Sequence, residues 1–511
     1  MLAHVHSFLL QGIEAVACEI EVDAAERGIA KTTVVGLPDA SVRESIERVR
    51  SALINSGYTF PCTRLLVNLA PADVPKVGPV YDLPMALGLL LANRTLESGR
   101  HQDLFFAGEL ALDGRLRPIR GTISMAMMAR KLGAEAVVVP EANAAEASAV
   151  EGIKVYGATT LAEVVGHLNG HQPLRPVEPV RCQEALAACR SEVDFDQVRG
   201  QESVKRALMI AAAGGHNVLM IGPAGTGKTM MAKALPGILP PMTRREALET
   251  TQIWSAAGRV PRGEALVTQR PVRSPHHTAS AGSLVGGGTH PGPGEVSLAH
   301  NGVLFLDEAP EFSRSVLETL RQPLEDGVVT ISRVAATYRF PARFMLVVAM
   351  NPTPGGDFAR DAASLKQMNR YLGRISGPLI DRLDIHVEVP RIRFEELSGK
   401  RSAASSQQMQ QQVVAARRRQ WARNPDDLSH NGRLGGRQLD RVVELDETGM
   451  GLLRGAMQQL NLSARAYDRI RRVARTIADL EQSESVQSHH IAEAVQYRLL
   501  DRRLDASFTG S

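Results

Sequence analysis

The residues with the clearest chemical meaning lie in one glycine-rich segment, which matches the phosphate-loop pattern G-x-x-x-x-G-K-[ST]. Its residues are Gly222, Pro223, Ala224, Gly225, Thr226, Gly227, Lys228 and Thr229. The glycines let backbone N–H groups point at phosphate oxygens, Lys228 brings a positive charge to the β- and γ-phosphates, and the Thr229 hydroxyl is a ligand for Mg²⁺. Residues 216–221 read as a strand that enters the loop, and residues 230–235 begin a helix that leaves it. A glycine-rich turn is the alternative, but these flanking elements favour a site for ATP and Mg²⁺.

Two adjacent carboxylates, Asp307 and Glu308, follow the apolar run at 303–306. Sheets of α/β proteins bind their ligands at the carboxyl ends of the strands. Successive side chains of a strand point in opposite directions, so the two acids need different roles. We expect Asp307 to hold Mg²⁺ through its water shell and Glu308 to polarise the attacking water. The alternative is a strand that ends in a solvated acidic turn.

Three further residues are candidates for sensing the nucleotide. Asn351 follows an apolar run at 344–350, where its amide can orient water or contact the γ-phosphate; Asn-Pro is also a common turn. Arg382 stands between Asp381 and Asp384 and is either an arginine finger or a partner in a surface salt bridge. Arg465 opens the helical pattern at 464–480 and is either a second sensor or one of many arginines on a solvated face.

The elements that must position these residues form several domains, since 511 residues suffice for two to four. Strand-like runs at 16–22 and 65–69 and helical patterns at 39–56 and 83–92 predict an α+β domain first. The phosphate-loop region alternates apolar strands with helices, which predicts an α/β domain with a mostly parallel sheet. The expected boundaries are an α+β domain at 1–168, a proline-containing linker at 169–195, the α/β ATPase core at 196–393 and a helical lid at 394–511.

Composition excludes several classes of protein. Net charge is +4, which permits a nucleic-acid partner without requiring one. No apolar run reaches the ~20 residues of a membrane-spanning helix, and the first residues lack the basic start of a signal peptide. The four cysteines are scattered without a C-x-x-C pair, so we expect neither disulfides nor a zinc site and place the protein in the cytoplasm. They are Cys18, Cys62, Cys182 and Cys189.

The order of these motifs resembles the AAA+ ATPases of the magnesium-chelatase-like group and, more closely, the ComM/YifB family. The blocks that carry this resemblance are 196–201, 273–280, 286–288, 293–302 and 320–327. It implies a homo-oligomeric ring, expected to be a hexamer, in which Arg382 enters the neighbour's ATP site and Arg465 is the second sensor. It also implies a DNA helicase that drives branch migration during natural transformation. A chelatase-type motor that remodels a partner protein is the second interpretation.

The chain departs from this family and from a second resemblance in ways that matter. Family members carry a cysteine quartet after the sensor asparagine, whereas residues 351–357 contain no cysteine, which excludes that zinc site. The first domain resembles the proteolytic domain of Lon, but Val80 stands at the nucleophile position and Met125 at the lysine position. Ser124 is adjacent but lacks a partner. We therefore expect a Lon-like fold without peptidase chemistry.

Candidate contacts to DNA lie between the ATP motifs and just after them. The glycine- and histidine-rich insertion at 273–300, with Arg273, His276, His277 and His290, is expected to be flexible and to project into the ring pore. Residues 328–340 alternate as a β-hairpin does, with Arg333 at the tip as a phosphate contact without base specificity. A purely structural hairpin is the alternative. Arginine runs at 417–423 and 469–475 fit DNA contact, a solvated helix face or contacts between subunits.

Overall fold

The computed structural model describes residues 1–25, 29–180, 186, 193–261, 263–289, 291–333, 336–353, 371, 373–392, 404–423, 430–460 and 462–498. The chain forms two compact units. The first contains Met1–Ala185 and Arg244–Thr268, and the second contains Leu186–Thr243 and Gln269–Ser511. None of the described helices combines the length and the apolar character needed to cross a membrane.

The first unit is built on a seven-stranded mixed sheet. In spatial order its strands are β3 (Lys31–Val35), β4 (Arg64–Ala70), β2 (Glu14–Ala24), β1 (Leu2–Gln11), β5 (Leu104–Phe106), β8 (Ala136–Pro140) and β9 (Lys154–Ala158). β2 runs antiparallel to β1 and β4, and the other neighbouring pairs are parallel. The expected α+β architecture of this part of the chain is confirmed.

Helices cover both faces of this sheet, because successive side chains of its strands point to opposite faces and both faces carry apolar residues. Val5, Ile20 and Val138 belong to one buried cluster, which includes side chains of α1 (Ala40–Asn55) and α2 (Asp82–Ala92). Neighbouring positions such as Phe8 and Val137 belong to a second cluster with α3 (Thr122–Lys131) and α4 (Glu141–Ser148). Asp39 caps α1 by accepting a hydrogen bond from the N–H of Val42, which explains why the helix begins there.

A segment from the middle of the chain completes the first unit. Helix α9 (Arg244–Ala256), which lies within the range expected for the ATPase core, packs on α3, and Leu248 and Leu266 join the second cluster. The Ser255 hydroxyl accepts from the N–H of Gly121 at 2.9 Å and donates to Glu146 Oε1 at 2.5 Å. Residues 196–393 therefore do not all belong to one compact unit.

The second unit has a five-stranded sheet in which each neighbouring pair is parallel. Its strands, in spatial order, are β11 (Val272–Arg273), β14 (Val303–Leu306), β17 (Met345–Met350), β10 (Val218–Ile221) and β18 (Ile385–Glu388). β10, β14 and β17 are buried at every residue, as expected of a parallel sheet whose two faces are covered. The predicted α/β architecture is confirmed.

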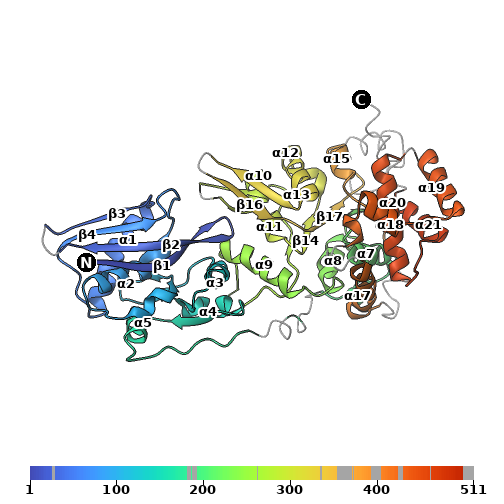
Figure 1. Ribbon diagram of the computed structural model, residues 1–511. Coiled ribbons are helices and arrows are strands. Elements are labelled where there is room, and N and C mark those ends of the chain that lie inside the picture. Colours follow the sequence, from blue (N-terminus) through green and yellow to red (C-terminus); the bar gives the residue numbers. More distant parts are fainter. Residues whose placement is uncertain are drawn as a thin grey trace. The chain divides into compact units, whose positions relative to one another are not determined.

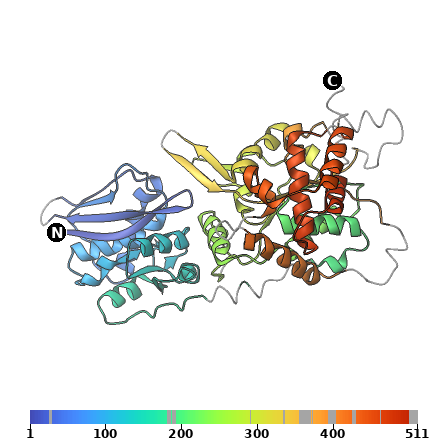
Figure 2. The same cartoon turned by 45° about the vertical axis from the view of Figure 1, so that its right-hand side comes forward.

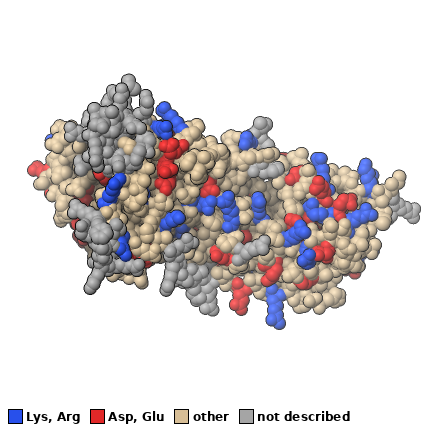
Figure 3. Space-filling view, turned by 180° about the vertical axis from the view of Figure 1, so that it is seen from behind, with Lys and Arg blue, Asp and Glu red and all other residues tan. Residues whose placement is uncertain are grey.

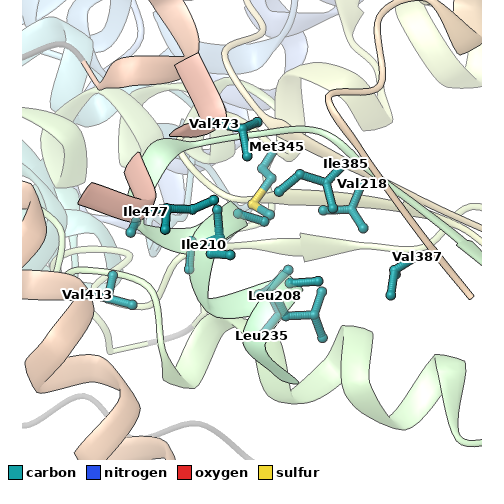
Figure 4. Close-up of a cluster of buried hydrophobic side chains, with 14 of the residues drawn as sticks. Leu208, Ile210, Val218, Leu235, Met345, Ile385, Val387, Val413, Val473 and Ile477 are labelled. Carbon is teal, nitrogen blue, oxygen red and sulfur yellow. The ribbon is translucent and has the colours of Figure 1, made fainter. Parts of the chain in front are cut away.

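The main core of the second unit joins this sheet to its helices (Figures 1 and 4). Figure 4 shows Val218, Met345 and Ile385 of the strands beside apolar side chains from α7 (Glu202–Gly214), α17 (Ser406–Arg423) and α20 (Ala464–Leu480). Helices α18 (Gly436–Val442), α19 (Glu447–Gln459) and α21 (Ser488–Gln496) complete a helical C-terminal region. This region agrees with the helical lid expected from the sequence.

Candidate active site

The phosphate-loop motif connects β10 to α8 (Lys228–Ala234), as the sequence predicts. Gly225 and Gly227 have φ angles of 76° and 87°, in the left-handed region that favours glycine. Gly222 is needed for a different reason: a Cβ there would lie 2.3 Å from the carbonyl oxygen of Val389. The backbone can therefore form this tight loop only with glycine at these positions.

Lys228 lies inside the loop and contacts the next strand. Its Nζ donates to the carbonyl oxygens of Gly222 at 2.6 Å and Pro223 at 2.8 Å and to Asn351 Oδ1 at 3.0 Å. Burial lowers the pKa of the Lys228 ammonium, while the charges of Asp307 and Glu308 oppose that change. The ammonium thus has three neutral oxygen partners and no carboxylate hydrogen bond among the described contacts, which leaves its charge available to an anion.

Donors suited to Mg²⁺ meet beside this lysine. Thr229 Oγ1 donates to Asp307 Oδ2 at 2.8 Å. The hydroxyl at the start of α8 and the carboxylate that follows β14 therefore lie next to each other. Oxygen ligands of this kind are those that Mg²⁺ prefers, and the loop's N–H groups and Lys228 suit a nucleotide phosphate. The residues present therefore fit Mg²⁺ and ATP, with Thr229 and Asp307 as the metal-side groups and Lys228 and the loop as the phosphate-side groups.

Glu308 stands next to this pair but faces solvent, with 55% of its side chain exposed. Its φ of 51° turns the chain out of β14, and its N–H donates to Asp307 Oδ1 at 3.0 Å. Asp307 is thereby held toward Thr229 while Glu308 points elsewhere. His277 Nδ1 lies 4.0 Å from Glu308 Oε2, a neighbour that sequence reasoning did not identify because the two residues are far apart in the chain.

The insertion at 273–300 is structured where it is described. It begins with β11 in the sheet and continues through α10 (Ala281–Val285), the short pair β12 (Gly286–Gly287) and β13 (Gly292–Pro293), and α11 (Glu295–Leu298). The expectation of a flexible insert is therefore wrong for these described residues, and its projection into a ring pore stays a prediction. Arg273 pairs bidentately with Glu295 at 2.6 and 2.9 Å, so its charge is already neutralised. Nothing in the sequence around Glu295 indicates that it pairs with Arg273.

Two histidines of the insertion, His276 and His277, lie together near the acidic pair. The rings of His276 and His277 have centroids 4.1 Å apart, and His277 is the one that approaches Glu308. His290, Cys182, Cys189 and residues 354–357 after Asn351 lie outside the described residues. The structure thus places His277 beside the Glu308 carboxylate and His276 beside His277.

Arg382 and Arg465 lie at the opposite end of the sheet from the phosphate loop. The loop follows the last residue of β10, whereas the Arg382 carbonyl accepts from Asn217 Nδ2 at 3.0 Å, just before β10 begins. Arg382 pairs with Glu325 of α13 (Arg321–Asp326), and Arg465 lies 3.5 Å from Asp381. Burial, followed by the charges of Arg321 and Arg465, lowers the pKa of the Arg382 guanidinium. Each of the two arginines is thus paired with a carboxylate at this end of the sheet, and among the described contacts neither touches the phosphate loop of its own chain.

The predicted hairpin is present as β15 (Val328–Ser332) and β16 (Thr337–Pro341). It stands out from the body of its unit (Figure 2). Arg333 is exposed at its end and donates to the carbonyl of Gly288 at 3.3 Å, and a Cβ on Gly286 would lie 3.3 Å from Ile331. The glycine-rich turn of the insertion and the hairpin therefore lie side by side.

The arginine runs near the C-terminus serve mainly to hold the helices together. Arg423 and Arg475 both pair with the buried carboxylate of Asp479, and Arg471 pairs with Asp440. Arg417 donates to the carbonyl of Ala212. The interpretation of these runs as a solvated face does not hold for these residues, since each has its charge satisfied inside the unit.

Val80 and Met125 of the first unit, expected from the sequence at the Lon nucleophile and lysine positions, both contact one apolar cluster. Met125 is fully buried in that cluster, and Val80 packs against it. Ser124 is also buried, and its hydroxyl donates to the carbonyl of Ile13 at 2.7 Å. None of the three side chains presents a nucleophile to solvent.

Comparisons with known proteins agree with this geometry. Family models match three stretches: "Magnesium chelatase, subunit ChlI" over residues 194–397, "Subunit ChlI of Mg-chelatase" over residues 20–143, and "Magnesium chelatase, subunit ChlI C-terminal" over residues 403–498. The chain is 44% identical over 506 residues to the YifB protein of Salmonella typhimurium and to the competence protein ComM of Haemophilus influenzae, covering 98% of each chain. Lon protease 2 of Bacillus subtilis is 27% identical over 169 residues, 30% of each chain.

Proposed function

Because this chain belongs to the ComM/YifB family of magnesium-chelatase-like AAA+ ATPases, we propose that it is an ATP-hydrolysing ring motor that acts on DNA in the cytoplasm. The proposed role is that of a helicase or branch-migration factor in natural transformation or recombination. The proposed domain boundaries remain 1–168, 169–195, 196–393 and 394–511, with α9 of the core packed in the first unit.

The observation that supports the ATPase proposal is the contact between residues that follow three strands of the sheet. Lys228 contacts Asn351, and Thr229 contacts Asp307. Bound Mg²⁺·ATP supplies a phosphoanhydride whose γ-phosphoryl group can pass to water. Lys228 and the loop N–H groups hold phosphate oxygens, and Asn351 keeps the lysine in place. Glu308 accepts the proton of the attacking water, a role for which its exposed carboxylate is suited.

The arginine group at the far end of the sheet supports a ring. A guanidinium stabilises the charge on a transferring phosphoryl group, but Arg382 and Arg465 have no path to their own loop. In a head-to-tail ring, each subunit's arginine group faces the next subunit's phosphate loop. We therefore assign Arg382 as the finger and Arg465 as the second sensor of the adjacent site, in a homo-oligomer of six subunits.

The DNA part of the proposal depends on the hairpin. Arg333 at its exposed end gives one cation per subunit, and a ring of such cations can follow phosphates without reading bases. Arg273 is a weaker candidate because Glu295 neutralises it, and His276 and His277 are retained as secondary candidates. Lys and Arg are interspersed with Asp and Glu on the face seen in Figure 3.

A protein-remodelling motor is the second candidate, favoured by the internal ion pairs that occupy the C-terminal arginines. The ATPase rate with and without single-stranded and branched DNA separates the two proposals. A DNA motor is expected to be stimulated by DNA and to bind it less tightly as salt rises, because phosphate contacts release counterions. If DNA neither binds at low salt nor changes the ATPase rate, the protein-remodelling proposal replaces it.

Arg333→Ala tests the hairpin within this experiment. This variant is expected to keep basal ATPase activity, since Arg333 lies outside the nucleotide site, and to lose DNA stimulation and strand displacement. Arg454→Ala removes an exposed arginine from α19 and is the matched control. Equal loss in both variants would show that general charge, and not the hairpin, is responsible.

A further inference from the structure

The free edge of the first unit's sheet carries a groove that the ATPase chemistry does not use. β3 is the outermost strand beside β4 (Figure 1). The groove has a volume of about 590 Å³ and lies along this strand, between it, α1 and the segment at 60–63. The residues that matter below are Lys31, Thr32, Val34, Arg43, Glu47, Arg50 and Phe60.

The backbone of β3 has room for one more strand. It pairs with β4 in parallel register from Lys31 opposite Arg64 to Val35 opposite Asn68. On its other side, no described strand lies next to it in the sheet. The N–H and C=O groups that face this side are therefore available for the ladder of an added strand.

The groove is positively charged. Arg43, Glu47 and Arg50 lie four and three residues apart along α1, so they share one face of the helix. All three are exposed, as is Lys31. Within the described part of the chain, no ion pair involves Lys31, Arg43 or Arg50, and the Arg50 guanidinium lies over the Phe60 ring at 5.4 Å. Arg43 and Arg50 thus line the groove from α1 and Lys31 lines it from β3, and Glu47 is the one acid among its described lining residues.

The two faces of the edge differ in chemistry. Thr32 and Val34 are half-buried, and Val34 packs against the core cluster that includes Ile46 of α1. The alternate residues are exposed, and Val35 on that side is 39% exposed, as is Leu66 of β4. An added strand would therefore place every second side chain near the arginines of α1 and the remaining ones beside an apolar surface.

We infer that β3 receives, by strand addition, an extended segment of a partner protein in which acidic residues alternate with β-branched apolar residues. The free ladder edge selects an extended peptide backbone, the cations of α1 select the acidic positions, and Val35 and Leu66 select the apolar ones. Glu47 between the two arginines disfavours the continuous negative charge of DNA. This surface would connect the motor to a protein and is separate from the proposed action on DNA.

The test uses the full-length protein and a fluorescein-labelled peptide of alternating Glu and Val, with binding followed by fluorescence anisotropy. Saturable binding is expected, with a loss of about tenfold or more in affinity for the Arg43→Glu/Arg50→Glu double variant, since each reversal turns an attraction into a repulsion. A peptide N-methylated at alternate residues keeps its charge but cannot form the ladder, and it is expected to lose at least as much. The Arg130→Glu/Lys131→Glu double variant on α3 is the control for charge reversal at exposed positions of the same unit.

Several outcomes would overturn the inference. These are absence of saturable peptide binding, equal binding of the N-methylated peptide, and an equal loss in the control variant. A single-stranded oligonucleotide serves as a competitor of the labelled peptide. If it displaces the peptide from the wild-type protein and binds as tightly as the peptide does, the groove is a charged patch for nucleic acid and not a site for strand addition. Arg43 and Arg50 are exposed, so folding is expected to be unchanged, and circular dichroism together with basal ATPase activity checks this for each variant.

Discussion

Removal of the Arg382 side chain provides the sharpest test of how the ring completes its active sites. Arg382 lies just before β18, at the end of the sheet where β10 begins. At about 3.3 Å per residue, the four residues of β10 separate this end from the phosphate loop by roughly 13 Å, more than an extended arginine side chain spans. Arg382→Ala should therefore leave its own nucleotide pocket intact and impair the neighbour's.

The expected loss can be estimated from the role of the guanidinium. An arginine finger contributes about 10³–10⁵ in turnover, so Arg382→Ala alone should have almost no ATPase activity while it still binds ATP. The lost ion pair should cost little, about 0–1 kcal/mol, because the partner Glu325 is 58% exposed and regains water; the Arg382 side chain is 11% exposed, so its lost packing adds to this cost. Near-normal thermal stability together with lost turnover is the expected combination.

Mixing variants shows where the arginine acts. Lys228→Ala subunits lack a working loop but keep Arg382, and Arg382→Ala subunits have the reverse defect. In an equal mixture, about one quarter of head-to-tail interfaces join an intact loop to an intact arginine, so roughly a quarter of wild-type activity should return if interfaces act independently. Arg454→Ala mixed with Lys228→Ala is the control for subunit exchange. If mixed rings assemble, as shown by size-exclusion chromatography, and no activity returns, Arg382 does not act in the adjacent site.

Four variants test three other parts of the structure. Glu308→Gln should still bind ATP but turn it over about 10²–10⁴ times more slowly, whereas Lys228→Ala should lose binding or hydrolysis; near-normal turnover of Glu308→Gln would contradict its assignment as the base. Ser255→Val should destabilise the first unit by about 1–3 kcal/mol in calorimetry, because the N–H of Gly121 loses its acceptor and the buried carboxylate of Glu146 keeps only the N–H of Ile123; an unchanged transition would mean that α9 does not stabilise this unit. Burial, and after it the positive charges of Arg417 and Arg433, hold the pKa of His430 well below its ordinary value. As the pH falls below about 6.5, this histidine therefore takes up a proton in the unfolded chain but not in the folded chain. Stability should then fall by at most about 1.4 kcal/mol per pH unit from this residue, and urea unfolding of His430→Gln should show a shallower acid loss than wild type.

The sequence alone was sufficient for the parts of this protein whose chemistry is local. A phosphate loop requires glycines, a lysine and a hydroxyl at fixed spacing within one turn, and the structure places Gly222 through Thr229 between β10 and α8 as that spacing predicts. Buried parallel strands have to be apolar throughout, so 303–306 and 345–350 could be recognised from composition alone. Strand β1 was missed because polar and apolar residues alternate over only part of it, where His4 and His6 lie on the more exposed face.

Only the tertiary structure determined which distant residues meet. Lys228 and Asn351 are 123 positions apart, and their contact depends on β10 and β17 being neighbours in the sheet. The pairing of Arg273 with Glu295 and of Arg423 with Asp479 turned apparent surface charges into internal ion pairs, because burial makes an unpaired charge costly. The hydrophobic effect placed α9 in the first unit: its apolar side chains complete the core beside α3, and no local pattern in residues 244–268 specifies which surface they bury.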